Sequence, residues 1–172
     1  MNTIEANGQN SSDSRQVVTF TIGQEEYAVP ILSVREIIRR VESTAIPCSG
    51  PGIEGIINLR GTIIPVVHMA DRLNIASQDG QSDDQRIVVL DIGRSQVGFL
   101  VDRVKQVIRV DAAQIAAPPR LGQGHEDFLD GVAKLDDRLV LLISPSKLTN
   151  EDIDEATVFA EQQSQTQHAT AA

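Results

Sequence analysis

"VVTFTIGQEEYAVPILSVREIIR" (residues 17–39) has a second copy in this chain, "IVVLDIGRSQVGFLVDRVKQVIR" (residues 87–109). The copies align without a gap at an offset of 70 residues, and their identical pairs are Val18/Val88, Ile22/Ile92, Gly23/Gly93, Val34/Val104, Ile38/Ile108 and Arg39/Arg109. A second pair of segments, "GIINLRGTIIPVV" (55–67) and "GVAKLDDRLVLLI" (131–143), aligns at an offset of 76. The chain therefore contains two copies of one structural unit, near 17–67 and 87–143.

Each copy has the sequence pattern of β-hairpins. Two runs rich in β-branched residues flank an Ile-Gly turn, and a second hairpin follows at 55–67 or 131–143. Between the hairpins of the first copy, residues 31–39 predict a short helical turn that runs into a strand. With at least four strands per copy, the chain is expected to be mainly β, with two small β-barrels side by side around a shared core. Pro65 has no amide hydrogen, so its strand is expected at a sheet edge or with a bulge there.

The ends of the chain differ in composition from this repeat. Residues 1–15 are polar and predict a disordered tail, and the repeat-containing domain covers 16–150. At the other end, 151–172 predict a short helix, over about 150–161, followed by a second disordered tail. The polar segment 71–85 begins as one helical turn and then becomes a surface loop between the two copies.

Charge and composition exclude several classes of partner. The net charge is −9 and aromatic residues make up only 3% of the chain, which argues against nucleic acid or an anionic membrane surface as a partner. The single cysteine, Cys48, cannot form an internal disulfide, and no apolar run approaches the roughly 20 residues of a membrane helix. These features predict a cytoplasmic protein without direct membrane insertion.

The turn between the two strands of 55–67 raises a functional question. It consists of Arg60 and Gly61, whereas the second copy turns through Asp136 and Asp137. Tight turns favour Gly, Asn and Asp, and no turn type requires arginine. An exposed guanidinium beside a glycine is suited to binding a carboxylate or the carbonyl groups at a helix end. The repeat therefore indicates that Arg60 has a role beyond the fold.

Three segments, "FTIGQEEYAVPILSVREII", "GIINLRGTIIPVV" and "VGFLVDRVKQVIRV", occur in an order that resembles the CheW family of bacterial chemotaxis adaptors, and the resemblance covers roughly 16–150. It implies two pseudo-symmetric five-stranded SH3-like β-barrels with short helices and no catalysis. The implied partners are the cytoplasmic hairpin tip of a chemoreceptor, received in the groove between the barrels, and the regulatory domain of a CheA-type histidine kinase. The implied location is cytoplasmic, at membrane receptor arrays through these partners.

The resemblance also implies a receptor-binding set. Carried over position by position, it consists of Val34, Glu36, Gly55, Arg60, Gly61 and Val107. Val34, Gly55 and Val107 are expected to form an apolar floor for a helix. Glu36 and Arg60 are expected to set the polar register at its rim. The resemblance identifies no kinase-binding residues. After "IIPVV" the family usually continues with Asp-Leu-Arg, whereas this chain has His68-Met69-Ala70, which changes the polar contacts expected beyond the hairpin.

Two chemical alternatives rest on isolated residues. A thiol enzyme would combine Cys48 with His68 or His125, but no nucleophile turn surrounds Cys48. A metal site would need His68, Asp71, His125, Glu126 and Asp127, whose spacing does not place ligands on one helix face. We therefore predict no enzyme activity, catalytic residue, metal or cofactor. A type IV pilus pathway, or another non-flagellar chemosensory pathway, remains open for the same adaptor.

Overall fold

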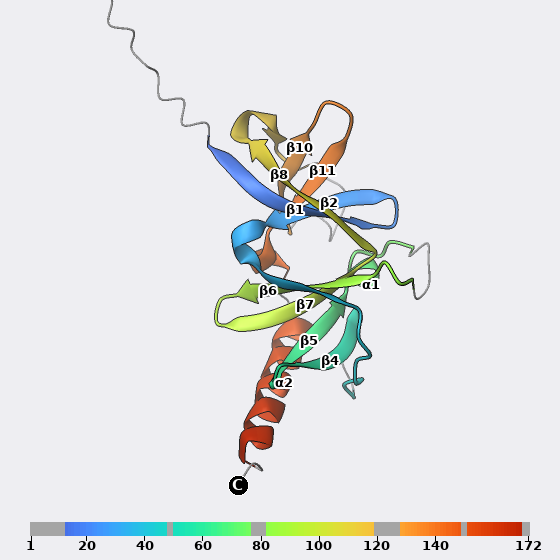
Figure 1. Cartoon of the computed structure of the whole chain (residues 1–172), viewed down its shortest axis with the longest axis vertical. Coiled ribbons are helices and arrows are strands. Elements are labelled where there is room, and N and C mark those ends of the chain that lie inside the picture. Colours follow the sequence, from blue (N-terminus) through green and yellow to red (C-terminus); the bar gives the residue numbers. More distant parts are fainter. Residues whose placement is uncertain (1–12, 48–49, 77–81, 119–127, 149–150, 170–172) are drawn as a thin grey trace, which may run out of the picture.

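A computed structural model describes residues 13–47, 50–76, 82–118, 128–148 and 151–169, and it contains two β-sheets, one above the other in Figure 1. The first sheet contains β1 (Ser14–Ile22), β2 (Glu25–Pro30), β8 (Arg103–Asp111), β9 (Ile115–Ala116), β10 (Leu129–Lys134) and β11 (Leu139–Ile143). The second contains β3 (Val34–Arg39), β4 (Ile53–Leu59), β5 (Thr62–His68), β6 (Arg86–Ile92) and β7 (Ser95–Val101). The helices are α1 (Met69–Arg72) and α2 (Glu151–Ala169), with 3-10 turns η1 (Ile31–Ser33), η2 (Ala112–Gln114) and η3 (Pro145–Lys147).

The sheets exchange hairpins between the two sequence copies. The strand orders are β8-β1-β2-β11-β10-β9 and β3-β6-β7-β5-β4. Each sheet therefore combines the first hairpin of one copy with the later strands of the other: β1 and β2 lie with β8 to β11, and β6 and β7 lie with β3, β4 and β5. The mainly β fold with two pseudo-symmetric barrels is confirmed, and the short β9 adds a sixth strand to the first sheet. We call the barrel containing β1 and β2 barrel A, and the barrel containing β6 and β7 barrel B.

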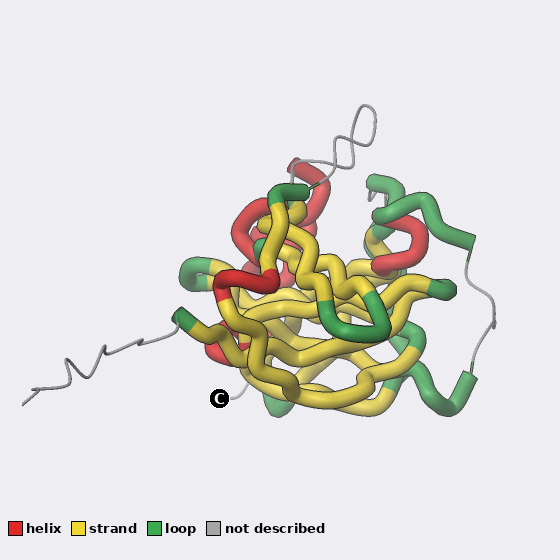
Figure 2. Tube along the Cα trace, turned by 90° about the horizontal axis from the view of Figure 1, so that it is seen from above, coloured by secondary structure: helices red, strands yellow, loops and turns green. Residues whose placement is uncertain are grey.

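Three groups of buried side chains hold the barrels together. One lines barrel A, including Val17 and Ala28, and a second lines barrel B, including Ile87 and Val89. The third lies between the barrels and includes the alternate residues Val18 and Val88. The exchanged hairpins thus bury both faces, which explains their nearly continuous apolar sequence. Figure 2 shows the strands filling the centre of the molecule, with the helices and loops around them.

The expectation of a sheet edge at Pro65 is wrong, because β5 is an inner strand between β4 and β7. The missing amide is tolerated because the parallel pairing of β5 with β7 starts only at Val66, opposite Gly98. On the same side of β5, the Ile63 amide donates to Ser164 Oγ of α2 at 2.9 Å rather than to a strand. A register shift is present in the neighbouring β4–β5 pair, between Ile53 and Gly55.

The boundaries of the terminal elements also differ from the expected ones. β1 begins at Ser14, which pairs with Asp111 on β8. α2 continues to Ala169, well beyond the expected end near 161, because the residues after Ala160 include four glutamines and a glutamate, which are good helix formers. Thr149, a residue type suited to capping the start of this helix, lies outside the described residues. Within the part of the chain that the structure describes, no helix is long and apolar enough to cross a membrane.

Candidate functional site

The hairpin of β4 and β5 turns through Arg60 and Gly61 with positive φ at both residues, 53° and 87°. Leu59 pairs with Thr62, so the connection is a two-residue turn of type I′. Asn58 Oδ1 accepts a hydrogen bond of 2.8 Å from the Gly61 amide and fixes the turn. Arginine is an unfavourable residue in the left-handed region, where Asn and Gly are preferred. The first position of this turn therefore carries a side chain that its backbone disfavours.

The second copy shows that this backbone is not a requirement of the repeat. Its hairpin also has a two-residue connection, in which the Leu135 amide donates to the Arg138 carbonyl. Neither Asp136 nor Asp137 has positive φ. The two equivalent hairpins thus use different turns, and only the first places an arginine in the left-handed region. This difference in backbone conformation supports the expectation that the fold alone does not account for Arg60.

Arg60 forms an ion pair with another residue of the predicted set. Its Nη2 lies 3.0 Å from Oε2 of Glu36 on β3. The Arg60 side chain is 80% exposed and that of Glu36 only 20%, so the carboxylate is part of the barrel surface and the guanidinium projects from it. This pair fixes one end of the guanidinium and leaves the rest open to solvent. Such an arrangement presents oriented donors to a partner with little further loss of side-chain freedom.

Barrel closure brings Glu36 and Arg60 together, because β3 and β4 are the outermost strands of their sheet. Beyond β3, Thr44 pairs with Ile56 on β4 through two backbone hydrogen bonds of 2.8 and 2.9 Å. Gly55 lies under this crossing, where a Cβ atom would come within 2.3 Å of the Thr44 carbonyl oxygen. Gly55 is buried, and the close approach of two backbone segments accounts for its glycine. The structure therefore places Gly55 where it supports the hairpin from below.

The two valines of the predicted set occupy different sheets. Val34 begins β3 and is partly buried against the core between the barrels. Val107 lies on β8 opposite Val18, and 51% of its surface is exposed. Its counterpart in the first copy is Ile37, also exposed at 39%. The structure thus brings Glu36, Arg60 and Gly61 into one cluster, with Gly55 beneath it, and places Val107 on barrel A.

The departure at His68-Met69-Ala70 lies at the junction of β5 and α1. Met69 and Ala70 are buried in the core between the barrels. His68 Nδ1 lies 2.8 Å from Asp71 Oδ2 within the first turn of α1. Apolar residues at 69 and 70 therefore serve packing here. The polar contact observed at this junction is that between His68 and Asp71.

Most residues of the two chemical alternatives, the thiol enzyme and the metal site, lie outside the part of the chain that the structure describes. Cys48, His125, Glu126 and Asp127 lie outside the described residues. Within the described ranges, no group of three or more His, Cys, Asp and Glu residues is arranged to hold a metal ion. Asn58 and Thr44 support the site and were not predicted from the sequence. Asn58, two residues before a predicted turn, is a recognisable signal for such a contact, whereas Thr44 lies in an irregular segment and gives none.

Comparison with known proteins is consistent across sequence and structure. A family model described as CheW-like domain matches residues 16–152. The "Probable chemotaxis protein CheW" of Rhizobium etli is 35% identical over 83% of this chain and 92% of its own length. The "Chemotaxis protein CheW" of Klebsiella aerogenes is 33% identical, over 80% and 83%. The crystal structure of the scaffolding protein TtCheW from Thermoanaerobacter tengcongensis superposes with a TM-score of 0.74 at 36% identity, and the match covers 81% of this chain and 94% of that one.

Proposed function

The chain belongs to the CheW-like domain family. We propose that it acts as an adaptor of chemosensory signalling by holding chemoreceptors and a CheA-type histidine kinase in one complex. The proposed mechanism is binding, with no catalytic step. The observation that carries the receptor half of this proposal is Arg60, held in an unfavourable backbone conformation and oriented by Glu36. The proposed location of the protein is the cytoplasm, at membrane receptor arrays, where its receptor partner holds it.

The proposed receptor site has a fixed polar part and an apolar part. Glu36, Arg60 and Gly61 form the polar part, in which Arg60 binds a carboxylate or helix-end carbonyls of the receptor's helical hairpin tip. Val34 and Val107 contribute apolar contacts in the groove between the barrels. Gly55 positions the hairpin and does not contact the receptor, because the Thr44 backbone covers the place where a side chain of residue 55 would lie. Receptor helices that shift against this fixed surface would change how the kinase is held.

Co-sedimentation tests the proposal. The purified protein is mixed with membranes carrying a chemoreceptor and with a CheA-type kinase, and kinase activity is measured in the pellet. We expect the kinase to pellet and become active only when this protein is present, and Arg60→Ala to weaken receptor binding in a folded protein. Failure to bind either partner in any cognate set would contradict the adaptor role.

Two alternatives make different predictions. If the same scaffold serves a type IV pilus or another chemosensory pathway, the receptor and kinase encoded by neighbouring genes will pellet with it while flagellar partners do not. If the protein is a thiol enzyme, Cys48→Ala will abolish an activity and leave complex formation intact. The family membership favours the adaptor over the enzyme.

A further inference from the structure

Each barrel contains one parallel pair of strands that diverges at one end. In barrel B the pair is β5 with β7, joined from Val66 and Gly98 onward, and in barrel A it is β11 with β2, joined from Leu141 and Tyr27 onward. The two pairs are equivalent in the repeat. Val66 and Gly98, which pair in barrel B, correspond to Leu142 and Ala28, which pair in barrel A. We call the open end of each pair seam A or seam B, after its barrel.

Seam B is covered by α2, which leaves a smaller hollow of about 290 Å³ against the strands. Ala156 and Ala160 are buried on one face of the helix at a spacing of four residues. One turn further, Ser164 accepts the hydrogen bond from the Ile63 amide on β5. On the other strand, Ser95 Oγ donates to Glu161 Oε1 at 3.3 Å. A helix with small residues on its buried face therefore bridges the two diverging strands, and Ile63 is only 8% exposed beneath it.

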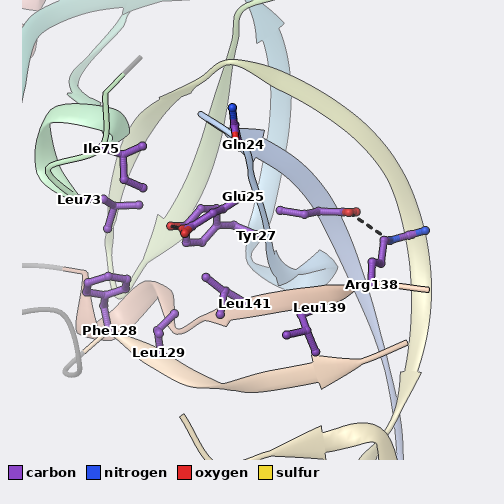
Figure 3. Close-up of a pocket in the computed structure, with 11 residues that line it drawn as sticks. Gln24, Glu25, Tyr27, Leu73, Ile75, Phe128, Leu129, Arg138, Leu139 and Leu141 are labelled. Carbon is purple, nitrogen blue, oxygen red and sulfur yellow. Dashed lines mark hydrogen bonds and ion pairs between the residues drawn. The ribbon is translucent and has the colours of Figure 1, made fainter. Parts of the chain in front are cut away.

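Seam A is equivalent to seam B and stands open as a groove of about 570 Å³. Its residues include Glu25, the counterpart of Ser95, and Leu139, the counterpart of Ile63. Leu139 is 61% exposed, in contrast to the 8% of Ile63. Figure 3 shows Leu73 and Ile75 on one side of this groove and Leu139 and Leu141 on the other, with Tyr27 between them.

The reason for the difference lies in the segments that follow the two equivalent strands. After β11, the chain passes through η3 into α2, which is 19 residues long. After the equivalent β5, helix α1 ends after four residues at Arg72. Of the described residues that follow it, up to Ala76, Leu73 and Ile75 reach the edge of seam A. Among the described residues, the first copy therefore supplies the wall of its seam but no helix that fills it.

We propose that seam A is a docking groove for an amphipathic helix of another protein, in the position that α2 occupies in seam B. The groove is apolar, so the docked face carries small or aliphatic residues four apart, like Ala156 and Ala160. In this position a side chain of the helix lies beside Glu25, where α2 in seam B places Glu161 beside Ser95. The partner helix therefore carries a lysine or arginine there.

Charge excludes a second copy of α2 as this occupant. Its first turn contains three acidic residues, and Glu161 would face Glu25. Asp136 and Asp137 add negative charge at the adjoining hairpin tip, whereas Arg138 is already paired with the buried carboxylate of Glu26 at 3.1 Å. None of the six residues of the proposed receptor site lines this groove. Seam A is thus a second binding surface on the adaptor.

A labelled peptide tests the groove on the full-length protein. The peptide has the sequence of residues 151–169 with Glu161→Lys, and the unmodified sequence is the matched control peptide. We expect saturable binding of the lysine peptide, at least tenfold tighter than that of the control. In NMR spectra of the protein, the chemical-shift changes caused by this peptide should cluster at Tyr27, Ile75 and Leu139. Leu139→Glu should weaken binding at least tenfold, whereas Val158→Glu, a change at a similarly exposed aliphatic residue on α2, should leave it unchanged.

Three results would overturn the proposal. The first is the absence of saturable binding by the lysine peptide. The second is a set of shifts at Ile63 and Ser95, which would mean that the peptide displaces the chain's own α2. The third is self-association of the protein, seen by sedimentation and abolished by Leu139→Glu, which would make a second copy of the chain the occupant.

Discussion

Replacing Arg60 separates two effects of this residue: the effect of its backbone conformation on the free energy of unfolding, and its proposed role in receptor binding. At φ 53° a non-glycine residue loses about 1 kcal/mol, and asparagine recovers roughly half of this because it tolerates the left-handed region. The ion pair with Glu36 contributes about 0.5 kcal/mol, since the Arg60 side chain is 80% exposed. For Arg60→Asn these two effects nearly cancel, so the free energy of unfolding should stay within about 0.5 kcal/mol of the parent. Arg60→Ala keeps the strained backbone and loses the pair, and should be about 0.5 kcal/mol less stable.

Receptor binding should not follow this order. Both variants remove the guanidinium, so both should weaken co-sedimentation with receptor membranes about tenfold, the effect expected from losing one charge-assisted contact of roughly 1.4 kcal/mol. Glu36→Gln keeps Arg60 but releases it, and should weaken binding by a smaller factor. Urea unfolding gives the stabilities on the same samples. If Arg60→Asn lowers the free energy of unfolding by more than about 2 kcal/mol, Arg60 is structural. If this variant binds receptor like the parent, Arg60 has no part in receptor binding.

Three further changes test other parts of the structure. Gly55→Ala should destabilise the protein by about 1–3 kcal/mol, because the new methyl group would meet the Thr44 carbonyl; urea unfolding at parent stability would contradict the barrel closure. Ser164→Ala removes the acceptor of the Ile63 amide and should speed hydrogen exchange at Ile63 relative to Val67, which has a strand partner; equal protection in both proteins would show that α2 does not hold this edge. Burial, the hydrogen bond to Glu25 and its charge raise the pKa of Tyr27 well above its usual range. The protonated phenol therefore adds stability that is present below about pH 10 and is lost above it, and Tyr27→Phe should flatten this alkaline loss in unfolding curves.

The internal repeat made most of the fold predictable. Its apolar pattern located the hairpins, and the Ile-Gly and Arg60-Gly61 turns lie where the sequence placed them. The exchange of hairpins was not predictable, because a repeat shows which segments are equivalent and not which copy each segment pairs with. The inner position of Pro65 was missed for a related reason: a rule about one strand cannot foresee that its neighbour diverges beside it and that a helix covers the gap.

The site was predictable only in part. Comparing Arg60 with Asp136 singled out Arg60 as the turn residue expected to act in binding, and the structure adds that the two turns differ in backbone geometry. The ion pair with Glu36 joins positions 24 residues apart through barrel closure, which no local pattern reports. Gly55 looked like part of a binding floor, yet its neighbour is a backbone segment of the same chain. Seam A appears only when equivalent positions of both copies are compared in space.

The exchanged hairpins bear on how an adaptor of this form transmits force between partners. Because β1 and β2 come from one copy and pair with strands of the other, neither barrel can rotate on a flexible linker between two independent domains. The hairpins are buried on both faces, so a displacement of one barrel must repack the core between them. The Arg60 cluster on barrel B and Val107 on barrel A are therefore held at a fixed separation. A partner that contacted both sites would therefore meet one rigid surface, and under the proposed function a shift in that partner would move the adaptor as a whole.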